Sequence, residues 1–159
     1  MTIQFFPSHG FSMMIATAYQ TADEFLRRAQ DYLLGKEVVN GLMLGICLRL
    51  KRFPERIETA PYLATVADGG AIVLAAVMTP PQRVVLYSHI DPDMSLRGAQ
   101  FATKQSPSSK EIASQKALAM THRNDALAMV ARDLISPNWS VPGVVGPSYV
   151  AEDFAKTWT

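Results

Sequence analysis

Apolar residues recur at helical spacing from residue 21 onward. Thr21 and Glu24 form a capping-box pattern, in which the Thr hydroxyl accepts from a first-turn amide and the Glu carboxylate reaches back to the cap. This pattern predicts a helix that begins after Thr21 and ends near Gly35. Its apolar stripe consists of Leu26, Ala29 and Leu33.

A second helix is predicted from Glu37 to about Lys51. It carries a broad apolar stripe, and its basic C-terminal turn complements the helix dipole before Pro54 forces a break. The small residues Asn40, Gly41 and Gly45 interrupt the stripe. We expect them to allow the close approach of a neighbouring element.

After Pro54 the spacing of apolar residues changes from a helical pattern to one typical of extended strands. Residues 62–67 and 71–78 flank Asp68-Gly69-Gly70, and these glycines supply the positive φ that a tight hairpin turn requires. The second strand is apolar almost throughout, which indicates burial on both faces. Residues 83–88 predict a third strand, so the three strands form an antiparallel meander.

Residues 91–122 are rich in Ser, Gln and Lys and predict a polar insertion or long loop, with a weak helix at 109–120. A clear helix is expected from residue 124 to about 135. A short strand at 143–146 and a last helix from Pro147 complete the chain, since proline is favoured in a first helical turn.

This order of elements predicts a mixed α/β (α+β) fold with a mostly antiparallel central sheet and helices on both faces. At 159 residues, the chain is long enough for one domain spanning residues 1–159. The net charge of +1 offers no electrostatic basis for binding nucleic acid or an anionic membrane, so neither partner is expected. The single cysteine, Cys47, is compatible with a reducing compartment, and no secretory signal is recognisable, so we expect a cytoplasmic protein.

Few residues in the sequence suggest a catalytic or metal-binding role. His89 follows the third strand and precedes Asp91 and Asp93, so it is either a general base, a metal ligand or part of a polar turn. No second His or Cys lies at a recognisable metal spacing, so the turn is favoured and no metal site is expected. Cys47 has only apolar helix neighbours and predicts a buried core residue.

The last segment, VPGVVGPSYVAEDFAKTWT, combines a short strand, a Gly-Pro turn and a helix. A helix N-terminus attracts anions, but Pro147 removes one amide donor. The stripe of Val150, Phe154 and Trp158 favours packing.

Residues 42–88, with DALAMVARDL and VPGVVGPSYVAEDFAKTW, resemble the N-terminal half of two-half bacterial proteins of the GNAT acetyltransferase superfamily. The resemblance covers roughly residues 20–90 and 124–158. It rests on the strand from Tyr62 with its Asp-Gly-Gly turn, the exit MTPP, and GVVGP leading into an apolar helix. It implies the same order of elements, acetyl-CoA as the acyl donor and an amine as the acceptor.

The acetyl-CoA signature of that superfamily is not found around Gly98, because Ser95 and Gln100 replace its expected residues. The Asn and general-acid Tyr of the later motif are also missing in the two registers centred on Ala151 and Ala155. Catalytic and cofactor-binding residues therefore stay unassigned, with Tyr87 and His89 as the candidates at the end of the third strand.

Two hypotheses follow from the resemblance. The chain is either an N-acetyltransferase, acting alone or as part of a two-half enzyme, or a non-catalytic GNAT-like module. In the relatives the catalytic half follows this region, and a module would dimerise or dock onto a second GNAT-like half.

Overall fold

The computed structural model describes residues 2–5, 13–91, 109–137 and 139–158. Its centre is a six-stranded sheet whose spatial order follows the sequence. All neighbouring strands are antiparallel except the last pair, β5 and β6, which is parallel. The strands are β1 (Thr2–Phe5), β2 (Met14–Ala18), β3 (Tyr62–Asp68), β4 (Ala71–Met78), β5 (Val84–Tyr87) and β6 (Val144–Val145).

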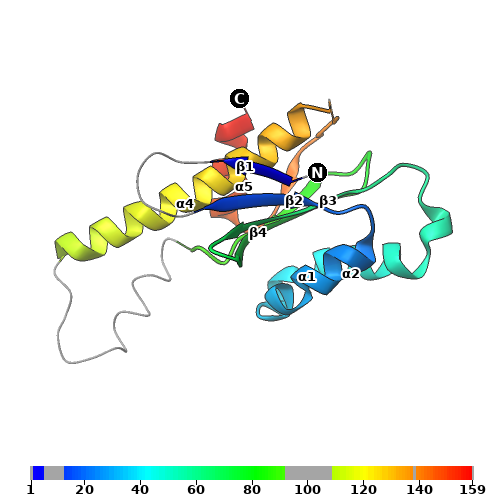
Figure 1. The fold of residues 1–159 in the computed structure, drawn as a ribbon, viewed down its shortest axis with the longest axis horizontal. Helices are drawn as coiled ribbons and strands as arrows, with labels where there is room; N and C mark the ends of the chain where they lie inside the picture. Colours follow the sequence, from blue (N-terminus) through cyan, green and yellow to red (C-terminus); the bar gives the residue numbers. More distant parts are fainter. Residues whose placement is uncertain (1, 6–12, 92–108, 138, 159) are drawn as a thin grey trace.

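Helices cover both faces of this sheet, as Figure 1 shows. Helices α1 and α2 pack on one face, while α4 and α5 pack on the other. The helices are α1 (Ala22–Leu34), α2 (Glu37–Arg52), the short 3-10 helix η1 (Pro54–Arg56), α4 (Ser109–Ile135) and α5 (Ser148–Trp158). The predicted mixed α/β fold with a mostly antiparallel sheet is therefore confirmed.

Strand β4 shows why the sheet needs cover on both faces. Successive side chains of a strand point to opposite faces, so an apolar strand in a central position buries side chains on both. Ala75 and Val77 pack with α1 and α2. Leu74, Ala76 and Met78 belong to the core beneath α4 and α5.

The predicted helix start and hairpin turn are confirmed in atomic detail. The Thr21 hydroxyl accepts from the Glu24 amide at 3.2 Å, and the Glu24 carboxylate accepts from the Thr21 amide at 3.3 Å. In the hairpin between β3 and β4, Gly69 and Gly70 have φ values of 56° and 88°. These values match the turn that suits the twist of antiparallel strands.

Two differences from the sequence prediction concern long-range structure. Strands β1 and β2 were not predicted, and β2 is held by pairing with β3, almost fifty residues away. In addition, residues 109–135 form one continuous helix instead of a weak helix followed by a separate one. The first half of α4 exposes most of its side chains, so it lacks the apolar stripe that would have predicted it. The rest of the predicted insertion, residues 92–108, lies outside the described residues.

Within the described parts of the chain, no helix is both long enough and apolar enough to span a membrane.

Candidate functional site

The carboxyl ends of β5 and β6 lie at one edge of the sheet. The two strands pair only through Val84 with Val144 and Val85 with Val145. A Cβ on Gly146 would lie 2.5 Å from the Leu86 carbonyl oxygen, so glycine is required where the chain turns from β6 into α5. In open α/β sheets, ligands bind in the crevice outside the carboxyl ends of parallel strands. This edge is therefore a candidate position for a ligand site.

Tyr32 of α1 binds the segment that follows β5, residues 88–91. Its hydroxyl donates to the Val73 carbonyl at 3.1 Å and accepts from the His89 backbone amide at 3.0 Å. The Tyr32 ring lies against Tyr87 at 5.3 Å and edge-on to His89 at 5.6 Å between centroids. The structure thus brings the two sequence-predicted candidates, Tyr87 and His89, against one side chain that the sequence did not indicate.

The contacts of Tyr32 also select the tautomer of His89. Nδ1 of His89 lies 3.3 Å from the Tyr32 oxygen, whose proton is already donated to Val73. Nδ1 can then only donate, which leaves the imidazole lone pair on Nε2. Partial burial lowers the pKa of His89, so the ring is neutral at pH 7 and Nε2 can accept a proton.

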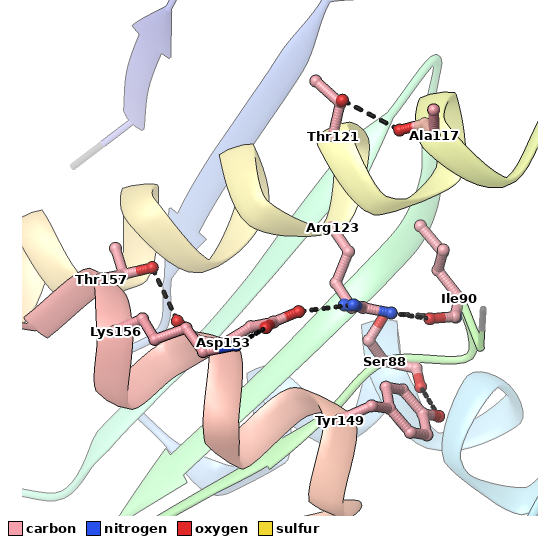
Figure 2. Close-up of polar contacts among 9 residues, drawn as sticks. All are labelled: Ser88, Ile90, Ala117, Thr121, Arg123, Tyr149, Asp153, Lys156 and Thr157. Atoms are coloured by element: carbon pink, nitrogen blue, oxygen red, sulfur yellow. Dashed lines mark hydrogen bonds and ion pairs between the residues drawn. The ribbon is translucent and has the colours of Figure 1, made fainter. Parts of the chain in front are cut away.

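Tyr149, in the first turn of α5, reaches the same segment from the other face of the sheet. Its hydroxyl donates to the Ser88 carbonyl at 3.0 Å, as Figure 2 shows. Burial, followed by the nearby charge of Asp91 and the hydroxyl of Tyr87, raises the pKa of Tyr149 to about 12. Tyr149 therefore keeps its proton throughout the neutral range.

Arg123 of α4 lies over the ring of Tyr149 and is almost fully buried. Figure 2 shows its guanidinium reaching between α5 and the chain that follows β5. It donates to the Ile90 carbonyl at 2.9 Å and to the Asp153 carboxylate at 2.5 Å, and it lies 5.1 Å from the centroid of the Tyr149 ring. Arg123 therefore connects α4, α5 and the segment after β5 at one point.

Asp153 balances the buried charge of Arg123. Burial of this carboxyl raises its pKa, but hydrogen bonds from Arg123 and Lys156 outweigh that effect and hold the pKa below its usual value. Asp153 is therefore ionised at neutral pH. The pair fixes α5, and with it Tyr149, relative to the end of β5.

Sequence reasoning missed four of these residues, namely Tyr32, Arg123, Tyr149 and Asp153. Tyr32 and His89 are 57 positions apart, and no local pattern predicts their contact. Arg123 lies between the predicted polar insertion, residues 91–122, and the helix predicted from residue 124, so the sequence assigned it no element and no partner. Tyr149 was assigned to a packing helix, and the prediction that Val150 and Phe154 pack there is confirmed.

Cys47 is fully buried, as predicted, and burial raises its pKa to about 12. Among the described residues no group of three or more His, Cys, Asp or Glu side chains could hold a metal ion. Asp93 lies outside these residues. His122, to which the sequence assigned no role, has Nδ1 3.3 Å from an Asp68 carboxylate oxygen.

The expectation for the small residues of α2 was wrong in part. Gly41 and Gly45 face open space, with nothing within 4 Å of a Cβ built on either residue. They line a cavity of about 740 Å³ between α2 and the β5–β6 end of the sheet. Asn40 is buried instead, and its side-chain amide donates to the Leu33 carbonyl at 2.9 Å to join α2 to the end of α1.

Comparisons with protein-family models, curated proteins and solved structures found no match. The resemblance to GNAT acetyltransferases is therefore an expectation from the sequence.

Proposed function

We propose that the chain is an N-acyltransferase of the GNAT type, which transfers an acetyl group from acetyl-CoA to an amine at the carboxyl ends of β5 and β6. One observation carries the proposal. Residues 88–91 follow β5 at the end of the parallel strand pair. A neutral histidine, His89, lies in this segment, and a protonated tyrosine, Tyr149 of α5, donates to its Ser88 carbonyl. Acyl transfer from a thioester to an amine requires one proton acceptor and one hydrogen-bond donor.

His89 is the proposed proton acceptor. An ammonium group must lose a proton before its nitrogen can attack the thioester carbonyl, and a neutral imidazole is suited to take it. The lone pair of Nε2 has no protein hydrogen-bond partner among the described residues, so it is available to an incoming amine. The lowered pKa of His89 keeps the ring in its basic form at neutral pH.

Tyr149 is the proposed donor. As the amine attacks, negative charge develops on the carbonyl oxygen and then on the leaving sulfur, and a positioned hydroxyl stabilises that charge. The high pKa of Tyr149 keeps its proton in place, and the substrate would compete with the Ser88 carbonyl for it. Arg123 and Asp153 act through Tyr149, because they hold the helix that carries it.

The experiment measures release of free CoA thiol from acetyl-CoA in the presence of a panel of primary amines. We expect amine-dependent release, and we expect Tyr149→Phe and His89→Gln to lower kcat by about 10²–10⁴-fold, the usual contribution of a positioned acid or base. Tyr62→Phe is the matched control, since it removes another buried tyrosine hydroxyl, bonded to Asp133 at 2.8 Å, away from the carboxyl end of β5. Equal activity in all three variants would contradict these roles.

A second candidate function, a non-catalytic GNAT-like module that dimerises or docks onto another GNAT-like half, is favoured by α2. Four of its apolar side chains are exposed, and Val38 is completely so. Exposed apolar clusters of this kind are typical of interaction surfaces. A monomeric mass by analytical ultracentrifugation would count against dimerisation. For either function we propose a cytoplasmic location, with which the free, buried thiol of Cys47 is compatible.

A further inference from the structure

We infer that the groove between α2 and the β5–β6 end of the sheet binds an amphipathic anion, meaning an apolar chain with one carboxylate or phosphate head. We call this cavity the α2 groove. Its main part has a volume of about 740 Å³. A smaller cavity of about 250 Å³ shares Leu42, Val85 and Val145 with it and continues it to Asn40 and Tyr87. The inference does not depend on acyl transfer.

The walls of the α2 groove suit an apolar chain. Val85 and Val145 supply the sheet side, while Leu42 and Ile46 supply the helix side. Gly41 and Gly45 also line the groove, and nothing lies within 4 Å of a Cβ built on either residue. A larger side chain at either position would occupy part of the groove. Cavities of about 300–1,000 Å³ with mainly apolar walls are typical of small-molecule sites.

The charge of the groove selects an anion. Arg49 and Arg83 lie at the end distant from Tyr87, and no acidic residue lines the main cavity. Within the described parts of the chain, neither arginine forms an ion pair, whereas Arg27 and Lys51 both pair with Asp23. Guanidinium groups bind carboxylates and phosphates well because their N–H donors match the oxygen geometry. A Cβ built on Gly143 would lie 3.4 Å from Cδ and Nε of Arg83, so the middle of this side chain passes close to Gly143.

The adjoining cavity beyond Arg49 is also lined by more basic than acidic residues. It has a volume of about 480 Å³ and adds Arg56 together with one carboxylate, Glu58. Along α2, the groove runs from Asn40 to Arg49, which at 1.5 Å per residue is about 14 Å. The predicted ligand is therefore an extended, medium-length chain whose head lies at Arg49 and Arg83 and whose apolar end points toward Tyr87.

The first arm of the test compares ligands by isothermal titration calorimetry, below their micelle concentrations. The probes are decanoate, decyl phosphate and decyltrimethylammonium, which share a tail and differ in the head. We expect both anions to bind and the cation not to bind, and the stronger anion identifies the natural head group. Equal binding of the cation, or no binding of either anion, would overturn the inference.

The second arm fills the groove. Gly45→Leu places a side chain in open space, and replacing a helical glycine also raises helix stability by up to about 1 kcal/mol. We expect this variant to melt at a higher temperature and to bind decanoate at least tenfold more weakly. Gly41→Leu, built on the same logic, serves as the second variant. Unchanged binding in a folded variant would contradict the site, and so would a change in oligomer mass instead of in ligand binding, because that outcome would make the groove a protein interface.

The third arm removes the charge. Arg83→Gln and Arg49→Gln should each weaken decanoate binding several-fold without affecting folding. Arg27→Gln is the matched control, since this arginine lies on α1 and is exposed. Equal affinity in Arg83→Gln, Arg49→Gln and the control would show that the arginines do not hold the head group.

Discussion

Replacing Arg123 by methionine tests how the candidate site is held together. Methionine keeps much of the apolar stem but removes the guanidinium, so the Ile90 carbonyl and the Asp153 carboxylate lose their shared donor. The side chains of Arg123 and Asp153 are 2% and 15% exposed, so this is a buried pair. Breaking a buried pair from one side costs about 3–5 kcal/mol, since the remaining charge is left without its partner.

We expect the lower end of that range. Asp153 retains some solvent access and a second partner, Lys156, at 3.2 Å. The predicted loss in the free energy of unfolding is about 3 kcal/mol, which for a chain of this size corresponds to about 6–12 °C in Tm. Urea denaturation followed by far-UV circular dichroism measures the loss. Lys156→Met is the control, and because Lys156 is mostly exposed it should cost less than about 1 kcal/mol.

A double-mutant cycle separates the interaction energy between Arg123 and Asp153 from the effect of each substitution on packing. Asp153→Leu alone should be as harmful as Arg123→Met, because it leaves a buried guanidinium without a carboxylate. The double variant should be less destabilised than the sum of the two single variants by more than about 1 kcal/mol. Additive effects, or a single variant within about 0.5 kcal/mol of the parent chain, would refute the reasoning.

The Arg123–Asp153 pair also predicts that the free energy of unfolding depends on pH. The folded pKa of Asp153 is lowered, so its contribution to stability is present above the unfolded value of about 3.9 and is lost as the pH falls through the folded value. Arg123→Met should remove that part of the acid dependence. An identical slope of stability against pH below 4 in both proteins would contradict the assignment.

Three further predictions follow from single positions. Gly146→Ala should cost about 1–3 kcal/mol, because its Cβ would lie 2.5 Å from the Leu86 carbonyl oxygen; urea titration measures this, and Gly143→Ala, whose nearest neighbour is a flexible side chain, is the milder control. Cys47 should not react with a thiol reagent until the protein unfolds, because it is fully buried and its pKa is about 12; stoichiometric labelling in native buffer would contradict this. His89→Ala should change the free energy of unfolding by less than about 1 kcal/mol, since it lies past the strand end; a larger loss in Tm would show a structural role.

The parts of the fold that local chemistry determines could be predicted from the sequence. The cap formed by Thr21 and Glu24 involves neighbours three residues apart. The turn at Gly69 and Gly70 needs a positive φ, which glycine adopts without strain. Each signal lies within a few residues of the structure that it determines.

The candidate site depends on contacts between distant segments. The contact between Tyr32 and His89, and the link from Arg123 to Ile90 and Asp153, join residues that are 30 to 57 positions apart. A buried arginine cannot be told from an exposed one by its neighbours in the sequence. The two candidates at the end of β5 were found because they follow a predicted strand, while their partners became evident only from the packing of α1, α4 and α5.

The most direct test of the acyltransferase proposal is a calorimetric titration of the folded chain with acetyl-CoA. The proposal predicts a saturable binding heat with one site per chain, and thiol release on addition of an amine that is strongly reduced in Tyr149→Phe. The absence of both heat and thermal stabilisation at millimolar acetyl-CoA, in protein shown to be folded, would contradict it.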